Sequence, residues 1–167
     1  MRALLYSLLL PLSLMVPACS PQAAENAPAP TAAGAATQAS LHPVSGLEVV
    51  PLTVTTPTGP HTFRVELART PQEQAKGLMF RTEMGPDEGM LFPYATPQVL
   101  SFWMKNTVLS LDLVFIDEQH RIINVAENAV PYSEQSILSD APGVAVLELN
   151  GGRARELGIV AGNKVDW

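Results

Sequence analysis

The sequence is poor in residues that commonly carry chemistry. It has one cysteine, Cys19, and three histidines, His42, His61 and His120, in 167 residues. A single cysteine excludes a disulfide within the chain, and the histidines lack the spacing of a metal site. There is no G-x-S-x-G nucleophile motif and no glycine-rich phosphate loop. We therefore expect no cofactor, and the sequence offers no candidate for a catalytic nucleophile.

Basic residues are also few. The chain has 10 Lys and Arg against 16 Asp and Glu, a formal net charge of −6. All of this excess falls in residues 47–167, which hold 15 acidic and 9 basic residues. Nucleic-acid binding requires a basic stripe or patch, so we expect no nucleic acid as a partner.

The first residues have the layout of a secretory signal. Arg2 precedes an apolar run that ends near Val16. The run is too short and wrongly flanked for a membrane-spanning helix, and small residues follow it. We predict a signal peptide at residues 1–18 that directs the chain across the inner membrane.

The cysteine stands at the end of this segment. Val16-Pro17-Ala18-Cys19 resembles the lipobox of bacterial lipoproteins, although Pro17 departs from the usual small or hydroxyl residue. Cleavage by an ordinary signal peptidase after Ala18 is the alternative. We predict lipidation of Cys19, which makes the membrane a partner and places the protein on the periplasmic face or in the cell envelope.

Composition separates a linker from a domain. Residues 19–46 are mainly Ala, Pro, Ser and Thr with a single charge and no hydrophobic period, which predicts a disordered tether. Residues 47–167 have the length of one domain with one core. We therefore predict a single β-rich domain there.

Strand patterns dominate this domain. Phe63, Val65 and Leu67 alternate with Thr62, Arg64 and Glu66 in a half-buried strand, which forms a hairpin with residues 47–56. Residues 99–107, 109–117, 120–127 and 144–150 are further strand candidates, and "LDLVFI" has the apolar character of a central strand. This pattern predicts a mainly β (α+β) fold, a compact, mostly antiparallel β-barrel-like or strongly curved sheet with two short helices.

The first helix has clear end signals. Thr70 is suited to the N-cap, Pro71 to the first helical position, and Glu73 to a capping box. Gly77 is a natural C-terminal stop. We predict a short helix at 71–76 and a second, of one or two turns, within 151–158.

Six motifs carry a family resemblance. They are "GLMFR" (77–81), "GMLF" (89–92), "FWMKNT" (102–107), "LDLVFID" (111–117), "LELNGG" (147–152) and "GIVAGNKV" (158–165). In this order they resemble the bacterial and archaeal domain-of-unknown-function family 192, over about residues 62–167. Ser110, Gly151 and Asn163 depart from residues common in that family. The resemblance implies a small barrel-like β domain, often secreted or lipid-anchored, and implies no activity.

The stretch "SFWMKNT" (101–107) suggests a site. In an extended strand Phe102 and Met104 face one way, and Trp103 and Lys105 the other. An indole beside an ammonium suits a sugar ring or an anion. The alternative is that Trp103 packs under a loop while Lys105 extends to solvent.

Asp112 is the second candidate. It opens a strand that we expect to be buried, and an unpaired buried charge is costly, so it requires a partner. Lys105 and Asn106 lie across the predicted turn, and Arg81 is a third option. Lys105 and Asp112 are either an acid/base pair or a structural ion pair.

Two further groups complete the candidates. Arg81 and Glu88 flank a turn, where Arg81 suits bidentate capture of an anion, and an Arg81–Glu88 salt bridge is the alternative. Four methionines fall within 26 residues and suggest Cu(I) ligands or gap-filling core residues. They are Met79, Met84, Met90 and Met104.

These observations favour a lipid-anchored extracytoplasmic domain that binds a small anionic or sugar-like ligand. Its candidate ligand-binding residues are Arg81, Glu88, Trp103, Lys105, Asn106 and Asp112. Three alternatives stay open: a cell-envelope hydrolase or transferase that uses Lys105 and Asp112, a structural or partner-binding lipoprotein, and Met-based Cu(I) binding.

Overall fold

The computed structural model describes residues 40–167. The predicted signal peptide, Cys19 and the linker up to residue 39 lie outside this range. Residues 40–46, which composition assigned to the linker, lie against the domain. Strand β1 (Ser40–Leu41) pairs with residues 48–49, and His42 accepts a backbone hydrogen bond from Gly46. Within residues 40–167, no helix has the length and apolar character needed to cross a bilayer.

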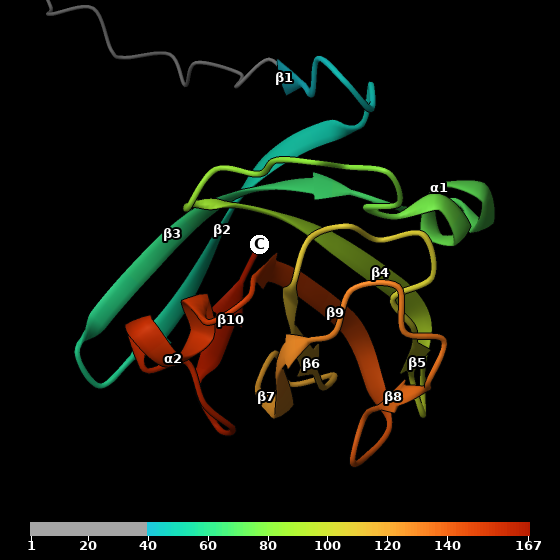
Figure 1. Cartoon of the computed structure of the whole chain (residues 1–167). Coiled ribbons are helices and arrows are strands. Elements are labelled where there is room, and N and C mark those ends of the chain that lie inside the picture. Colours follow the sequence, from blue (N-terminus) through green and yellow to red (C-terminus); the bar gives the residue numbers. More distant parts are fainter. Residues whose placement is uncertain (1–39) are drawn as a thin grey trace, which may run out of the picture. The chain divides into compact units, whose positions relative to one another are not determined.

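The described chain is mainly β, as predicted, and has two short helices (Figure 1). After β1 the elements in chain order are β2 (Glu48–Thr56), β3 (Gly59–Leu67), α1 (Pro71–Lys76), β4 (Glu88–Gln98), β5 (Ser101–Phe102), β6 (Leu111–Ile116), β7 (Ile122–Ala129), β8 (Ile137–Leu138), β9 (Gly143–Asn150), α2 (Arg153–Leu157) and β10 (Lys164–Asp166).

One large sheet has the strand order β1-β2-β3-β4-β9-β6-β7, and β10 pairs with β2. The β3–β4 pair is parallel, and the other pairs are antiparallel. The expected barrel is wrong because the sheet stays open. Between β10 and the β7 end there is one isolated bridge, Arg121 to Lys164, and a few turn hydrogen bonds, not a ladder of paired residues.

The core lies on both faces of the central strands. Along β9, Leu147 and Leu149 pack into one cluster that includes Ala154 of α2, whereas Val146 packs into a second cluster on the opposite face. Strand β6 lies between β7 and β9 and is buried at all six positions. This confirms the prediction of a central strand from "LDLVFI".

Helix α1 has the predicted ends. The Thr70 side chain accepts a hydrogen bond from the Glu73 N–H, and the Glu73 carboxylate accepts from the Thr70 N–H, which completes the capping box. Gly77 has φ +46°, and a Cβ there would lie 3.3 Å from the Phe92 ring. Both the backbone angle and the close packing therefore favour glycine at this stop.

The stretch 99–107 differs from the expected strand. Only Ser101 and Phe102 are in strand β5, which pairs with β8 and not with β6. The chain then turns, and Asn106 adopts φ +55°. The predicted alternation partly survives, because Met104 is fully buried and Phe102 half-buried, while Trp103 is 48% exposed.

Candidate functional site

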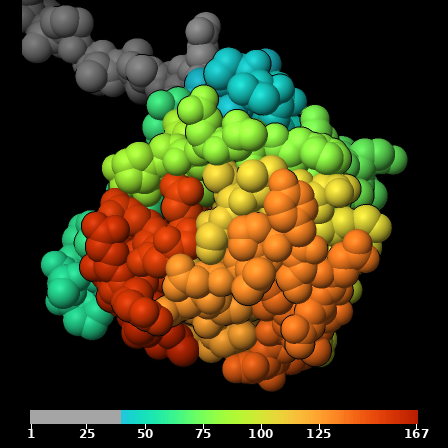
Figure 2. All heavy atoms as spheres, viewed as in Figure 1, coloured from blue at the N-terminus to red at the C-terminus, as the bar shows by residue number. Residues whose placement is uncertain are grey.

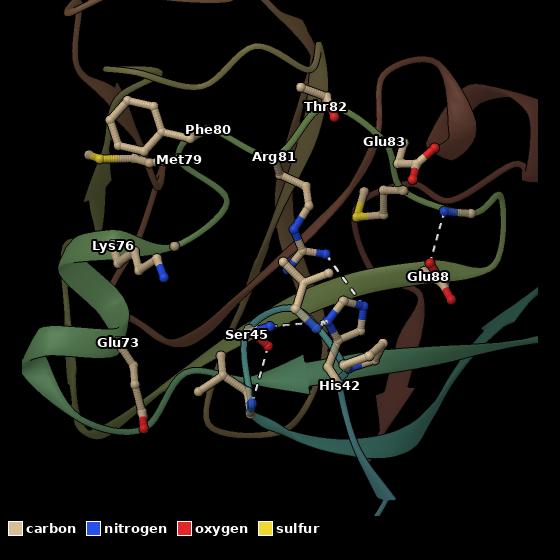
Figure 3. A pocket seen from close by; sticks show the side chains of 16 residues that line it. His42, Ser45, Glu73, Lys76, Met79, Phe80, Arg81, Thr82, Glu83 and Glu88 are labelled. Atoms are coloured by element: carbon tan, nitrogen blue, oxygen red, sulfur yellow. Dashed lines mark hydrogen bonds between the residues drawn. The ribbon is translucent and has the colours of Figure 1, made fainter.

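A cavity of about 750 Å³ lies between residues 42–47 and residues 73–88 (Figure 3). In Figure 2 the cyan N-terminal end of the described chain lies on the green band that contains these later residues. Arg81 and Glu88 line the cavity, so the structure brings these two candidates together. Its sixteen lining residues are His42, Pro43, Val44, Ser45, Leu47, Glu73, Lys76, Gly77, Met79, Phe80, Arg81, Thr82, Glu83, Met84, Gly85 and Glu88.

A buried carboxylate of β3 holds the cavity wall together. The Arg81 guanidinium donates to Glu66 at 3.0 Å, and the Ser45 hydroxyl donates to the same carboxylate. His42 Nε2 lies 3.6 Å from Glu66. Arg81 also faces His42, with 3.5 Å between their nitrogens, and Figure 3 shows these two side chains. The Glu66 side chain is only 5% exposed. This network therefore ties residues 42–45 to the sheet and fixes the orientation of Arg81.

Sequence reasoning missed Glu66. The alternation of the hairpin placed it with Thr62 and Arg64 on the solvent face, but the segment before residue 47 covers it. Because that segment has linker-like composition, nothing in the pattern of β3 indicated the cover.

Glu88 has another role than ion pairing with Arg81. Its carboxylate accepts the Gly85 N–H at 2.9 Å and closes the turn before β4. No ion pair joins Arg81 to Glu88 among the described residues. The cavity thus has a fixed cation in Arg81, while Lys76, Phe80 and Glu83 are exposed at its edge.

Trp103 and Lys105 face one another as the sequence suggested. The Lys105 ammonium lies 5.0 Å from the centroid of the Trp103 ring, a cation–π arrangement. It also lies 4.0 Å from the carboxylate of Glu134. Trp103 lines a second, smaller pocket, whereas Lys105 and Asn106 line neither hollow.

Asp112 is a structural residue in this geometry. It is fully buried and accepts three backbone hydrogen bonds, from Asn128 at 2.8 Å, Gly152 at 2.9 Å and Ala154 at 2.8 Å. It therefore anchors the start of α2 and the end of β7. Among the described residues it makes no ion pair with Lys105, so the acid/base couple has no geometric support.

Asn106 supports the backbone at Phe80, two of the four methionines pack in the core, and the other two line the cavity. The Asn106 carbonyl accepts the Phe80 N–H at 2.9 Å, and its amide lies 3.8 Å from the Met79 sulfur. Met90 and Met104 are fully buried in the second core cluster, where thioethers fill space between other apolar side chains. Met79 and Met84 line the cavity, so the Cu(I) alternative rests on these two.

The smaller pocket, about 290 Å³, contains the functional candidate that the sequence reading overlooked. Glu148 of β9 is 5% exposed and lines this pocket with Tyr94, Phe102 and Trp103. Burial raises the pKa of Glu148 to about 8. The signal was an acidic residue between Leu147 and Leu149 in a strand otherwise read as core.

Fold and site define a small β-rich domain with a cavity of about 750 Å³. Its main sheet is open and curved (Figure 1). The chain belongs to the DUF192 family, described as "Uncharacterized ACR", whose model matches residues 53–167. This confirms the family suggested by the sequence motifs.

Two solved structures are similar. A protein of unknown function from Novosphingobium aromaticivorans is 55% identical, with a TM-score of 0.76, over 79% of this chain and 94% of its own. A protein from Sinorhizobium meliloti, described as a candidate transcription regulator, is 40% identical, with a TM-score of 0.70, over 72% of this chain and 94% of its own. A comparison with curated proteins gives no significant match.

Ser110 and Gly151, two residues that the sequence analysis singled out, are spatial neighbours. The Gly151 N–H donates to the Ser110 carbonyl at 2.8 Å. A Cβ at residue 151 would lie 2.5 Å from the Ser110 hydroxyl and 3.0 Å from its Cβ. Serine at 110 and glycine at 151 therefore fit each other, and both lie beside Asp112 and not at the cavity.

Proposed function

We propose that this domain binds a small sugar-like ligand in the cavity beside Arg81. The observation that carries the proposal is the cavity itself. Its volume of about 750 Å³ lies within the range of small-molecule sites. Apolar side chains and a few converging polar groups line it, as is usual for such sites.

The charges of the lining favour hydroxyl groups over a simple anion. Two cations, Lys76 and Arg81, share the lining with three carboxylates, those of Glu73, Glu83 and Glu88. A bare anion would meet repulsion from the carboxylates, whereas a sugar hydroxyl both donates to a carboxylate and accepts from Arg or Lys. A sugar that carries a carboxylate would add an ion pair with Arg81.

Phe80 supplies the apolar surface for such a ligand. Its side chain is 70% exposed, and its backbone has φ +63°, a conformation uncommon for a bulky residue. Strain of this kind clusters at binding sites, where the surrounding contacts maintain it. The bond from the Phe80 N–H to Asn106 provides such a contact, and the exposed ring offers a face for stacking.

A titration with glucose and glucuronate, followed by amide NMR shifts of the purified protein, tests the proposal. We expect saturable shifts confined to residues 42–47 and 73–88, and we expect glucuronate to bind more tightly than glucose. Phe80→Ala should weaken binding by about fivefold or more, the loss of one aromatic contact. Tyr132→Ala is the matched control, because Tyr132 is a 61% exposed aromatic residue at φ +61° that does not line the cavity.

Two results would contradict the proposal. One is the absence of saturable shifts with either sugar. The other is an equal effect of Phe80→Ala and Tyr132→Ala, which would show that the ring beside the cavity has no special role. Binding of glucuronate without binding of glucose would show that the ligand requires a carboxylate, and would exclude a neutral sugar.

We also propose that the domain is held at the membrane through a lipid on Cys19, after export directed by residues 1–18. The support is the sequence pattern that ends at the only cysteine. Metabolic labelling with a fatty acid tests this, and we expect Cys19→Ala to abolish incorporation. Cys19→Ser is the conservative companion, and labelling that persists in either variant would exclude the anchor.

Transcription regulation, the role suggested for the Sinorhizobium protein, has no comparable support in this chain. The net charge of residues 47–167 is −6, whereas a DNA-binding face requires clustered Lys and Arg. Six of the nine basic side chains there form ion pairs with carboxylates. The surface charge therefore opposes nucleic acid as the ligand.

A further inference from the structure

Glu148 is a buried carboxyl group without a partner. Among residues 40–167 no hydrogen bond or ion pair satisfies its side chain, and burial is the cause of its raised pKa. Every fully enclosed side-chain nitrogen or oxygen of the described chain has a hydrogen-bond partner. The Glu148 oxygens are therefore not sealed in the core, and they reach the smaller pocket that Glu148 lines.

The position of Glu148 in the sheet explains its burial. Strand β9 runs between β4 and β6, and Glu148 stands opposite Met90 on one side and Leu113 on the other. Both neighbours are fully buried in the core, with 0% solvent exposure. A leucine at this position would complete the second core cluster, so packing alone does not account for a carboxyl group here.

The walls of the pocket are suited to a cation. Three aromatic side chains, Tyr94, Phe102 and Trp103, line it with Glu148. Aromatic faces attract cations, most strongly when water is excluded. The Lys105 ammonium already lies 5.0 Å from the Trp103 ring centroid, which shows that this indole accepts an ammonium group.

We propose that this pocket binds ligands through a protonated amine, with the ammonium group placed against the Glu148 carboxylate and among the aromatic rings. The cation supplies the counter-charge that the protein does not provide. Gln74 and Thr107 also line the pocket. The Gln74 amide donates to the Ala68 and Pro93 carbonyls and the Thr107 hydroxyl donates to the Lys105 carbonyl, so each side chain keeps its oxygen as an acceptor for the rest of a small ligand. This site is distinct from the cavity beside Arg81, although Lys76, Gly77 and Met79 line both.

Binding of an ammonium ion changes the protonation of Glu148. With its pKa near 8, the free carboxyl group is mostly protonated at neutral pH, so the cation displaces a proton to solvent as the ion pair forms. The other titratable groups that line the pocket are Tyr94 and Lys76. Burial and the Glu148 charge raise the pKa of Tyr94, so it stays neutral in this range.

The probe is propylammonium, with uncharged propanol as its matched analogue. The chain has two tryptophans, Trp103 and Trp167, and therefore two indole N–H signals in an NMR spectrum. Trp167 stacks on His120 and does not line the pocket, so it is an internal control. We expect propylammonium to shift the Trp103 signal saturably, with a millimolar dissociation constant, and to leave the Trp167 signal in place.

The pH dependence gives the sharpest readout. Affinity should rise by about tenfold per pH unit between about pH 6 and pH 8 and then level off, because one proton is released per ligand below the pKa of Glu148. Calorimetry in two buffers of different ionisation enthalpy should detect the same proton. An affinity for propylammonium that does not change across this range would overturn the proposal.

Glu148→Gln keeps the shape of the side chain and removes the charge. It should weaken propylammonium binding by about tenfold or more and abolish the pH dependence. Glu127→Gln is the control, because Glu127 lies on β7, pairs with Arg155 and does not line the pocket. Equal binding by wild type and Glu148→Gln would refute the proposal, and so would equal binding of propanol and propylammonium. If Glu148→Gln does not fold, the pH profile of the wild type decides the question alone.

Discussion

Removal of the Asp112 carboxylate should destabilise the domain more than any change at the cavity edge. Asp112→Ala leaves three backbone N–H groups, of Asn128, Gly152 and Ala154, without their acceptor. An unsatisfied buried donor costs about 1–3 kcal/mol. Water that enters the vacated space reduces this cost, so we expect a loss of roughly 3–6 kcal/mol. Since small domains have only about 5–15 kcal/mol of stability, most of it would be lost.

Urea denaturation measures this change, and Asp117→Ala is the matched control. Asp117 also accepts two backbone hydrogen bonds, from Gln119 at 2.9 Å and Arg121 at 2.8 Å, but in an exposed turn where water replaces the carboxylate. We expect it to cost about 1 kcal/mol or less. Asp112→Asn should fall between the two, because one amide oxygen still accepts while the NH₂ group meets a backbone donor.

A double-mutant cycle tests whether Asp112 depends on Lys105. The Lys105 ammonium is half-exposed and pairs with Glu134 at 4.0 Å, so Lys105→Ala should change stability by less than about 0.5 kcal/mol. The coupling energy with Asp112→Ala should be near zero. A coupling above about 1 kcal/mol would refute the structural role assigned here and restore the ion pair suggested by the sequence.

Two further predictions concern the buried residues Glu148 and Gly89, and a third concerns the methionines that line the cavity. The pKa of Glu148 is raised from an ordinary value near 4.5 to about 8. The contribution of Glu148 to stability is therefore fully present below pH 4.5 and is lost as the pH rises to about 8. Urea denaturation over this pH range should show that the free energy of unfolding falls by a few kcal/mol in the wild type and stays constant in Glu148→Gln. Gly89→Ala should destabilise by about 2 kcal/mol or more, because its Cβ would lie 2.5 Å from the Glu148 carbonyl oxygen, whereas Gly59→Ala meets no atom within 4 Å and tests the effect of a positive φ alone. Cu(I) titration should show no saturable binding that Met79→Leu and Met84→Leu remove, and a stoichiometric site lost in those variants would revive the copper alternative.

Local signals in the sequence predicted what depends on neighbouring residues. The capping box of Thr70 and Glu73 and the stop at Gly77 lie within the eight residues 70–77, and the structure contains them. The central position of β6 was also a local prediction. A strand that is buried on both faces has a continuous apolar run and no alternation of polar and apolar residues. The order of motifs likewise identified the family.

The partners of the polar groups depended on distant backbone, which no local pattern describes. Asp112 is satisfied by N–H groups 16, 40 and 42 residues further along the chain. The expected contact with Lys105 assumed that residues 101–117 form a hairpin, but β5 pairs with β8 instead. The prediction of a barrel was wrong for a related reason, because closure of the sheet depends on how β10 meets β7, which are distant in the sequence.

The two hollows share one wall, and this wall gives the "FWMKNT" motif a role other than the expected one. Lys76, Gly77 and Met79 line both the cavity and the Glu148 pocket. Asn106 holds this wall through its carbonyl bond to the Phe80 N–H and its amide contact with Met79. Its side chain lines neither hollow, and its contacts position the wall. A ligand that moves the wall from one side must therefore alter the other side, which makes the two proposed sites thermodynamically coupled wherever the wall is displaced.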